Sequence, residues 1–181
     1  MNQDQLARLI RETLMHSPEI EIDGLGVFSR GAEGRISFRK SCGPRIFIAY
    51  AVEDVRFALE VYSALESRGY EPWIDRRKLL PGQNWIRRIE DAISSSDFFI
   101  ACFSKNSARK RGGFQAEIRY ALDCARRVPL DDVFIIPIRL DDCRVPRAIT
   151  RETQYVDLFP DFQAGFSRIL DIIEGQMRKV A

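Results

Sequence analysis

The chain has 181 residues, and its 28 Lys and Arg against 26 Asp and Glu leave a formal net charge of +2. That length fits one main domain with a small additional unit, and the near balance of charges argues against nonspecific nucleic-acid binding, which needs a large basic excess. The longest apolar runs, such as Phe98–Phe103, are far shorter than a membrane-spanning helix, and the N-terminus has no signal-peptide pattern. We therefore expect a cytoplasmic protein without membrane contact.

Thiol and imidazole side chains are few. Four cysteines, at positions 42, 102, 124 and 143, form no CxxC pair, and His16 is the single histidine. This set does not suit a zinc site, so no metal is expected. Because no nucleophile motif lies near His16, any acid–base catalysis must use carboxylates.

Residues 1–42 are predicted to form a small α+β unit. An amphipathic helix is expected from apolar residues at helical spacing, namely Leu6, Leu9, Ile10 and Leu14. Three short strands separated by glycine-containing turns follow. A unit of this size buries too little apolar surface to be stable alone, so we interpret it as an assembly or regulatory cap. Residues 22–28 resemble the strand turn of bacterial HU-like proteins without their basic arms, so DNA binding is not expected.

Residues 43–181 alternate predicted strands and helices. Five apolar segments have the length and composition of strands: 46–50, 70–75, 98–103, 133–138 and 155–159. Pro72 cannot donate to a strand ladder, which favours an edge position for the second of them. Asn84 is the expected N-cap of one intervening helix, and Gly69 the expected end of another. The alternation predicts a flavodoxin-like α/β fold, a doubly wound five-stranded parallel sheet that binds ligands at the carboxyl ends of its strands.

Two common uses of such a sheet are not supported. A phosphoacceptor aspartate would end the third strand, where Phe103 and Ser104 stand instead. A phosphate-binding turn would place glycines after the first strand, which is followed by Ala51, Val52 and Glu53.

The third predicted helix carries a candidate catalytic carboxylate. Glu117 falls about 80–90° from the centre of that helix's apolar stripe, so it should be half-shielded from water. Partial desolvation of this kind raises a carboxyl pKa. Lys105 and the cations of residues 109–111 precede Gly112 and Gly113 at the helix start, where free N–H groups would form a phosphate seat. The same pattern also fits a glutamate that is exposed to water and follows a stretch of exposed charged residues.

Residues 45–175 resemble a bacterial Toll/interleukin-1 receptor (TIR) domain. The matching segments follow one another in the family's order and spacing: Ile46–Tyr50 with Glu53 and Asp54, Trp73–Asp75, Leu79–Trp85, Ile89–Ile93, Ser94–Asp97, Phe114–Ile118 and Ile136–Asp142. Many prokaryotic TIR domains consume NAD⁺, so the resemblance implies an NAD⁺ nucleosidase of the hydrolase or ADP-ribosyl cyclase type, with NAD⁺ as substrate and no cofactor. It also implies self-association through TIR–TIR contacts and a partner TIR or sensor protein.

The resemblance assigns roles to particular residues. The family's catalytic residue is a glutamate in the third helix, which matches Glu117. The loop after the second strand gates the pocket and contacts a neighbouring subunit, which implicates Arg76, Lys78, Pro81, Gly82 and Trp85. The expected substrate-binding residues are Tyr50, Asp75, Arg111, Gly112, Gly113 and Phe114. Core or capping roles fit Tyr50 and Asp75 equally well, and Trp85 also fits a loop anchor.

One position departs from the family pattern. An aromatic residue commonly stands four positions before the catalytic glutamate, where it can stack on a base, and here Gly113 occupies that position. Loss of a stacking face costs about 1 kcal/mol of ligand binding. Two functions therefore stay open: an oligomerisation-activated NAD⁺ glycohydrolase or cyclase, for instance in anti-phage defence, and a catalytically silent interaction module that acts as a scaffold or interferes with host signalling. One carboxylate is sufficient for the first, because nicotinamide leaves as a neutral group and needs no general acid.

Overall fold

The computed structural model describes residues 3–17, 19–22, 26–31, 34–40, 43–74, 84–107 and 112–180. The chain divides into two compact units, Met1–Gly43 and Pro44–Ala181. Each unit has a β-sheet of its own, three-stranded in the first and five-stranded in the second.

The first unit consists of one helix and an antiparallel meander. Its elements are α1 (Gln3–His16), β1 (Glu19–Ile22), β2 (Gly26–Arg30) and β3 (Ile36–Lys40), with strand order β1-β2-β3. Ile10 and Leu14 of α1 are buried, as their helical spacing predicts. Phe28 of β2 stands directly opposite Phe38 of β3, with ring centroids 4.6 Å apart. The expected helix and three strands are therefore present.

The second unit is built on a parallel sheet. Its strands are β4 (Arg45–Ala49), β5 (Glu71–Trp73), β6 (Phe98–Phe103), β7 (Ile135–Arg139) and β8 (Val156–Asp157). They pair in parallel in the order β5-β4-β6-β7-β8, which confirms the predicted doubly wound, flavodoxin-like sheet. Pro72 lies in the edge strand β5, opposite Ile46, because an edge tolerates a residue with no N–H to donate.

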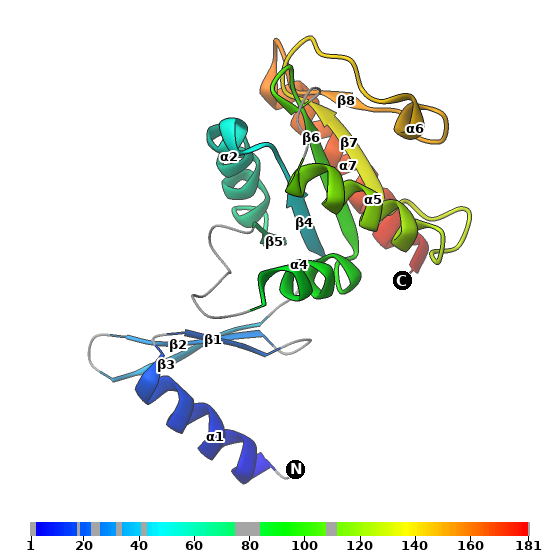
Figure 1. The fold of residues 1–181 in the computed structure, drawn as a ribbon. Helices are drawn as coiled ribbons and strands as arrows, with labels where there is room; N and C mark the ends of the chain where they lie inside the picture. Colours follow the sequence, from blue (N-terminus) through cyan, green and yellow to red (C-terminus); the bar gives the residue numbers. More distant parts are fainter. Residues whose placement is uncertain are drawn as a thin grey trace. The chain divides into compact units, whose positions relative to one another are not determined.

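Helices cover both faces of this sheet (Figure 1). They are α2 (Val55–Glu66), α4 (Trp85–Ser94), α5 (Gly113–Ala125), α6 (Arg147–Thr150) and α7 (Phe162–Val180), with a 3₁₀ turn η1 (Val52–Asp54) before α2. The short elements η1 and α6 were not expected from the sequence, because neither is long enough to show a helical period. No helix in the described part of the chain has the length and apolarity needed to cross a membrane.

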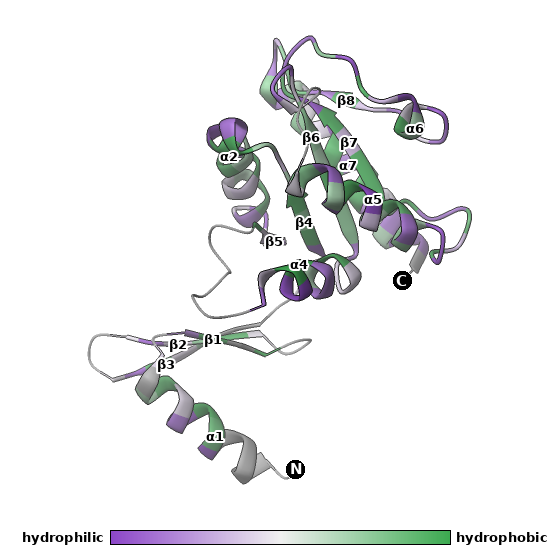
Figure 2. Cartoon of the chain, viewed as in Figure 1, coloured by the Kyte–Doolittle hydropathy of each residue, from purple (hydrophilic) through white to green (hydrophobic). Residues whose placement is uncertain are grey.

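The core has two layers because successive strand residues point to opposite faces. Phe47 and Phe99 pack with Ile93 of α4 and Ile118 of α5 on one face. On the other face, alternate residues of the same strands pack against α2 and α7, among them Ile46, Ile48 and Ile100. Figure 2 shows the consequence, apolar central strands beneath helices whose outer faces are polar. Burial on both faces explains why β4 and β6 are continuous apolar runs in the sequence.

Two helix ends form as their sequence signals predict. The side chain of Asn84 accepts a hydrogen bond from the backbone N–H of Arg87 at 3.2 Å, which caps α4. After α2, Gly69 has φ +82°, its N–H donates to the carbonyl of Glu66, and the N–H of Tyr70 donates to that of Leu65. This is the Schellman arrangement that favours glycine.

Candidate active site

The two central strands define where a ligand can enter. Chain order reverses between β4 and β6, since β5 lies beyond β4 and β7 lies beyond β6. In open α/β sheets, ligands bind outside the carboxyl ends of the strands at such a switch point. Here those ends are followed by η1, which closes with Asp54, and by Ser104.

A buried polar cluster joins these two strand ends. Ser104 Oγ donates a 2.5 Å hydrogen bond to Asp54 Oδ2, and Asn106 Nδ2 donates a 2.8 Å bond to Asp54 Oδ1. The same Ser104 hydroxyl accepts from the backbone N–H groups of Asn106 and Ser107, each at 3.1 Å. Asp54 is only 3% exposed and Ser104 only 2%. Because a buried carboxylate needs such partners, the cluster fixes the path of the chain as it leaves β6.

The neighbouring thiol, that of Cys102, is unreactive. Burial raises the pKa of Cys102 far above its ordinary range, and the charge of Asp54 raises it further. Since the thiolate is the reactive form, Cys102 is no nucleophile at neutral pH.

The start of α5 depends on a glycine backbone. Gly112 has φ +128° and ψ −152°, a conformation open essentially to glycine alone. Its carbonyl accepts from the N–H groups of Gln115 and Ala116 at 3.1 and 3.2 Å, which begins the helix. Arg111, expected beside it, lies outside the described residues, as do the cations of residues 109 and 110.

Glu117 lies one turn into α5. Its side chain is half-buried, as its place beside the apolar stripe predicts. Gly113 stands one turn earlier, and a Cβ added there would lie 3.8 Å from Glu117 Oε1, an ordinary van der Waals distance. The structure therefore brings Gly113 and Glu117 together at the start of α5.

Two other expected site residues pack in the core. Phe114 is buried and meets Phe103 edge to face, with centroids 5.7 Å apart, in the layer beneath α4 and α5. Tyr50 is buried in the opposite layer, beneath α2 and α7. The two rings thus belong to different faces of the sheet, and their roles toward a substrate stay predictions.

The gating loop is described only at its end. Trp85, the first residue of α4, is 55% exposed, so its ring is not a core anchor. Asp75, Arg76, Lys78, Pro81 and Gly82 lie outside the described residues.

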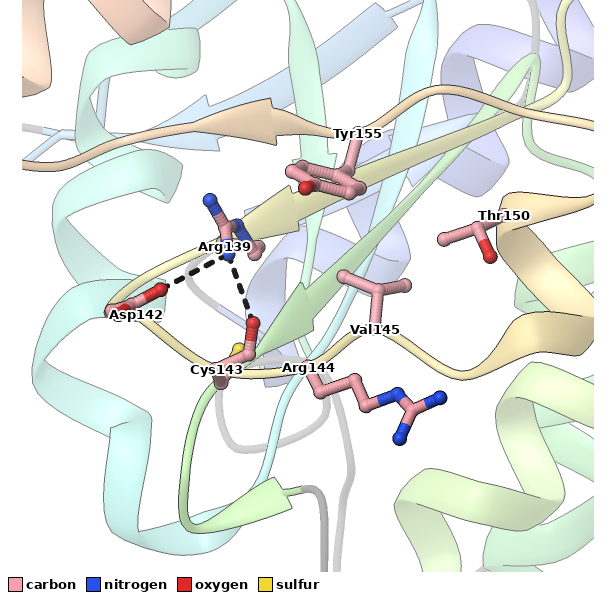
Figure 3. A pocket seen from close by; sticks show the side chains of 7 residues that line it. All are labelled: Arg139, Asp142, Cys143, Arg144, Val145, Thr150 and Tyr155. Atoms are coloured by element: carbon pink, nitrogen blue, oxygen red, sulfur yellow. Dashed lines mark hydrogen bonds and ion pairs between the residues drawn. The ribbon is translucent and has the colours of Figure 1, made fainter.

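The sequence did not predict a second feature, a pocket that lies beside the carboxyl end of β7. Figure 3 shows this pocket of about 550 Å³, lined by Arg139, Asp142, Cys143, Arg144, Val145, Thr150 and Tyr155. The Arg139 guanidinium donates to both Asp157 oxygens at 2.5 and 2.8 Å, donates to the Cys143 carbonyl at 3.0 Å, and lies 4.4 Å from the centre of the Tyr155 ring. The bond to Asp157 raises the pKa of Arg139 further. The Arg139–Asp157 ion pair therefore links β7 to β8, and no sequence motif predicts it.

The arrangement of the side chains that could bind a metal ion can be read from the structure. Across the ranges that the structure describes, no three or more His, Cys, Asp or Glu side chains are arranged to hold a metal ion.

Comparison with known proteins identifies the family of most of the second unit. The family model described as "TIR domain" matches residues 46–170. The chain belongs to the TIR domain family. The matched range contains Asp54, Ser104 and Glu117, and the resemblance found in the sequence is confirmed.

Three similar proteins illustrate the breadth of the match. The uncharacterized protein y4cD of Sinorhizobium fredii is 25% identical over 123 residues, which are 68% of this chain but 19% of that protein, so the chain spans about a fifth of its relative. The TIR domain of the Toll-related receptor TRR-2 from Hydra magnipapillata has 25% identity and a TM-score of 0.57, covering 69% of this chain and 93% of that one. A TIR-STING receptor from C. gigas in complex with 2′,3′-cGAMP shares the fold at 24% identity and a TM-score of 0.60, covering 76% of this chain and 41% of that one.

Proposed function

We propose that this TIR domain cleaves the nicotinamide–ribose bond of NAD⁺, as a hydrolase or an ADP-ribosyl cyclase, with Glu117 as its catalytic carboxylate. One observation carries the proposal: Glu117 is a half-buried carboxylate beside Gly113, a position with no side chain, at the start of α5. Gly113 adds no side chain of its own between this carboxylate and a ligand. NAD⁺ is the substrate in this proposal, and no cofactor takes part.

Cleavage of the nicotinamide–ribose bond requires few catalytic groups from the protein. As the C1′–N bond breaks, its electron pair goes to the pyridinium ring, which leaves as neutral nicotinamide and needs no proton. The ribose carbon becomes cationic, and a nearby carboxylate stabilises that charge more strongly in a partly desolvated site than in water. Water then attacks C1′ and loses a proton to the solvent to give ADP-ribose, or a nucleophilic group of the same molecule attacks C1′ to give a cyclic product.

We further propose that TIR–TIR contacts between copies, or with a partner TIR or sensor protein, complete the site in the cytoplasm, with anti-phage defence as one role. The exposed Trp85 supports this, because a large aromatic side chain in water suits a contact with a neighbour. The loop that precedes Trp85, residues 76–84, would then contact the neighbouring subunit.

A second function is favoured by the same glycine. Because Gly113 offers no ring to stack on a base, the domain could bind other TIR domains and cleave nothing. In that case the protein is a scaffold or a competitor in host signalling.

The deciding experiment is incubation of the full chain with NAD⁺ over a wide range of protein concentrations, with nicotinamide measured by chromatography. Glu117→Gln is expected to lower the rate about 100-fold or more, the size of effect seen for single electrostatic groups. Asp123→Asn is the matched control, because this carboxylate lies on the same helix and is 61% exposed. Nicotinamide release that Glu117→Gln leaves unchanged would contradict the catalytic role. No release even in crowded solution would favour the scaffold.

A further inference from the structure

The three-stranded sheet of the first unit has two edges of opposite charge. β1 forms one edge and β3 the other, because β2 lies between them. The β1 sequence contains two glutamates, Glu19 and Glu21, and no base. Residues 35–40, which comprise β3 and the residue before it, contain three cations, Arg35, Arg39 and Lys40, and no acid.

Both edges also carry apolar residues in the same alternation. The register places Ile20 opposite Phe28, and Phe28 opposite Phe38, so these residues share one face of the sheet. On β3, Ile36 and Phe38 are 42% and 49% exposed. Exposed apolar residues on an edge strand form a template for another strand, which most proteins guard against.

We propose that the first unit joins copies of this chain edge to edge, with β1 of one copy adding beside β3 of the next. β1 and β3 both run antiparallel to β2, so an added copy in the same orientation brings its β1 parallel to β3. The apolar face is then continuous from one copy to the next. Backbone hydrogen bonds supply the attraction, as in other cases of strand addition.

One register satisfies charge and hydrophobicity together. It places Glu19 beside Arg35, Ile20 beside Ile36, and Ile22 beside Phe38. Each such cross-strand pair contributes about 0.2–1 kcal/mol. The exposed Ile36 and Phe38 therefore gain further apolar neighbours from the next copy.

Like charges oppose the closed alternatives. A two-fold pairing of β3 with β3 would bring Arg35 of one copy toward Arg39 and Lys40 of the other, and a pairing of β1 with β1 would gather glutamates. The arrangement is therefore head to tail, and head-to-tail contacts that do not close into a ring continue into open chains of copies. Such chains raise the local concentration of the TIR domains, whether or not those domains cleave NAD⁺.

Sedimentation velocity of the full chain over a wide concentration range, at low and high salt, tests the proposal. The average mass is expected to keep rising with concentration beyond a dimer and to fall as salt screens the edges. Glu19→Lys with Glu21→Lys makes both edges basic, and Arg35→Glu with Arg39→Glu makes both acidic. Each double variant should associate about tenfold more weakly than the natural chain.

Exchange of the charges separates the proposal from a folding defect. In the chain with all four substitutions, the charges of the two edges are exchanged, so opposite charges still meet. In an equimolar mixture of the two double variants, basic edges of one variant meet acidic edges of the other. The fourfold variant and the mixture should therefore both regain association. Glu60→Lys with Asp123→Lys is the matched control, since both residues are exposed in the second unit, and it should associate as the natural chain does. A mass that stops at a dimer, a swapped chain that stays monomeric, or double variants that associate normally would each overturn the proposal.

Discussion

The hydroxyl of Ser104 donates a 2.5 Å hydrogen bond to the carboxylate of Asp54, a residue 50 positions earlier in the chain. The bond joins the turn after β4 to the turn after β6 at the switch point of the sheet. Both partners are buried, so water cannot replace either one when it is removed. The start of α5, which carries Glu117, follows directly along the chain from this cluster.

Removal of either partner should therefore be costly. Ser104→Ala is expected to lower the free energy of unfolding by about 1–3 kcal/mol, because it leaves a buried carboxylate and two N–H groups short of a partner. Asp54→Ala should cost at least as much. Urea unfolding of both single variants and the double variant should give a coupling energy of about 1 kcal/mol or more. Asp123→Ala is the control: it removes an exposed ion pair with Arg126 and should change the free energy of unfolding by less than about 0.5 kcal/mol. Additive losses in the Ser104 and Asp54 cycle would show that the hydrogen bond between them is not energetically significant.

Two glycines of α7 should respond to alanine in opposite directions. A Cβ at Gly165 would lie 2.1 Å from the carbonyl oxygen of Asp157, whereas a Cβ at Gly175 meets nothing within 4 Å. Gly165→Ala must push α7 away from β8, and we expect a loss of about 2–4 kcal/mol. Gly175→Ala should instead stabilise by about 0.5–1 kcal/mol, since alanine is the better helix former.

Thermal unfolding of the two variants checks this pair. Because both substitutions lie in one helix and add one methyl group, their difference reports the close approach alone. A Gly165→Ala variant as stable as Gly175→Ala would mean that α7 does not pack against β8 as closely as the structure has it.

The sequence predicted what short-range physics determines. Continuous apolar runs identified β4 and β6, Pro72 placed β5 at the edge, Asn84 marked the start of α4, and the apolar stripe placed Glu117 at the boundary of α5. Each of these follows from periodicity or from the chemistry of one residue.

Contacts between distant segments were beyond that reasoning. Asp54 appeared only in a matching segment and Ser104 only at the end of the third strand, because nothing local shows that the two turns meet. The Arg139–Asp157 pair was missed for the same reason. The contact of Phe114 with Phe103 was not predicted, since only the paired strands and the helix above them bring these rings within reach; the role of Phe114 toward a substrate stays a prediction.

Gly113 offers a test of the departure from the family pattern. A Cβ at this position meets Glu117 at an ordinary contact distance, so Gly113→Tyr should fold normally. If NAD⁺ binds beside Glu117, a ring there adds a stacking face of about 1 kcal/mol, and KM for NAD⁺ should fall about fivefold. Gly113→Ala is the control, because it adds a Cβ but no ring and should leave KM within about twofold. A higher KM in Gly113→Tyr than in Gly113→Ala would mean that a ring at this position obstructs the substrate.

Cys143 should report its environment through the pH dependence of its reactivity. Burial, followed by the charge of Asp141, raises the pKa of this thiol to about 11, against an ordinary value of about 8.5. At pH 8 the native thiol should react with iodoacetamide about 100-fold more slowly than the same thiol in unfolded protein, since only the thiolate attacks. Its rate should rise about tenfold for each pH unit up to about pH 11.

The same shift has a consequence for stability. Because folding favours the protonated thiol, its contribution to the free energy of unfolding is complete below about pH 8.5 and is lost as the pH rises toward 11. Peptide mapping by mass spectrometry measures alkylation at each cysteine separately. Cys124, which is only partly buried, gives the comparison within one molecule and should be alkylated before Cys143 at pH 8. A rate at Cys143 that levels off near pH 8.5 would show that the thiol is open to water in the native protein.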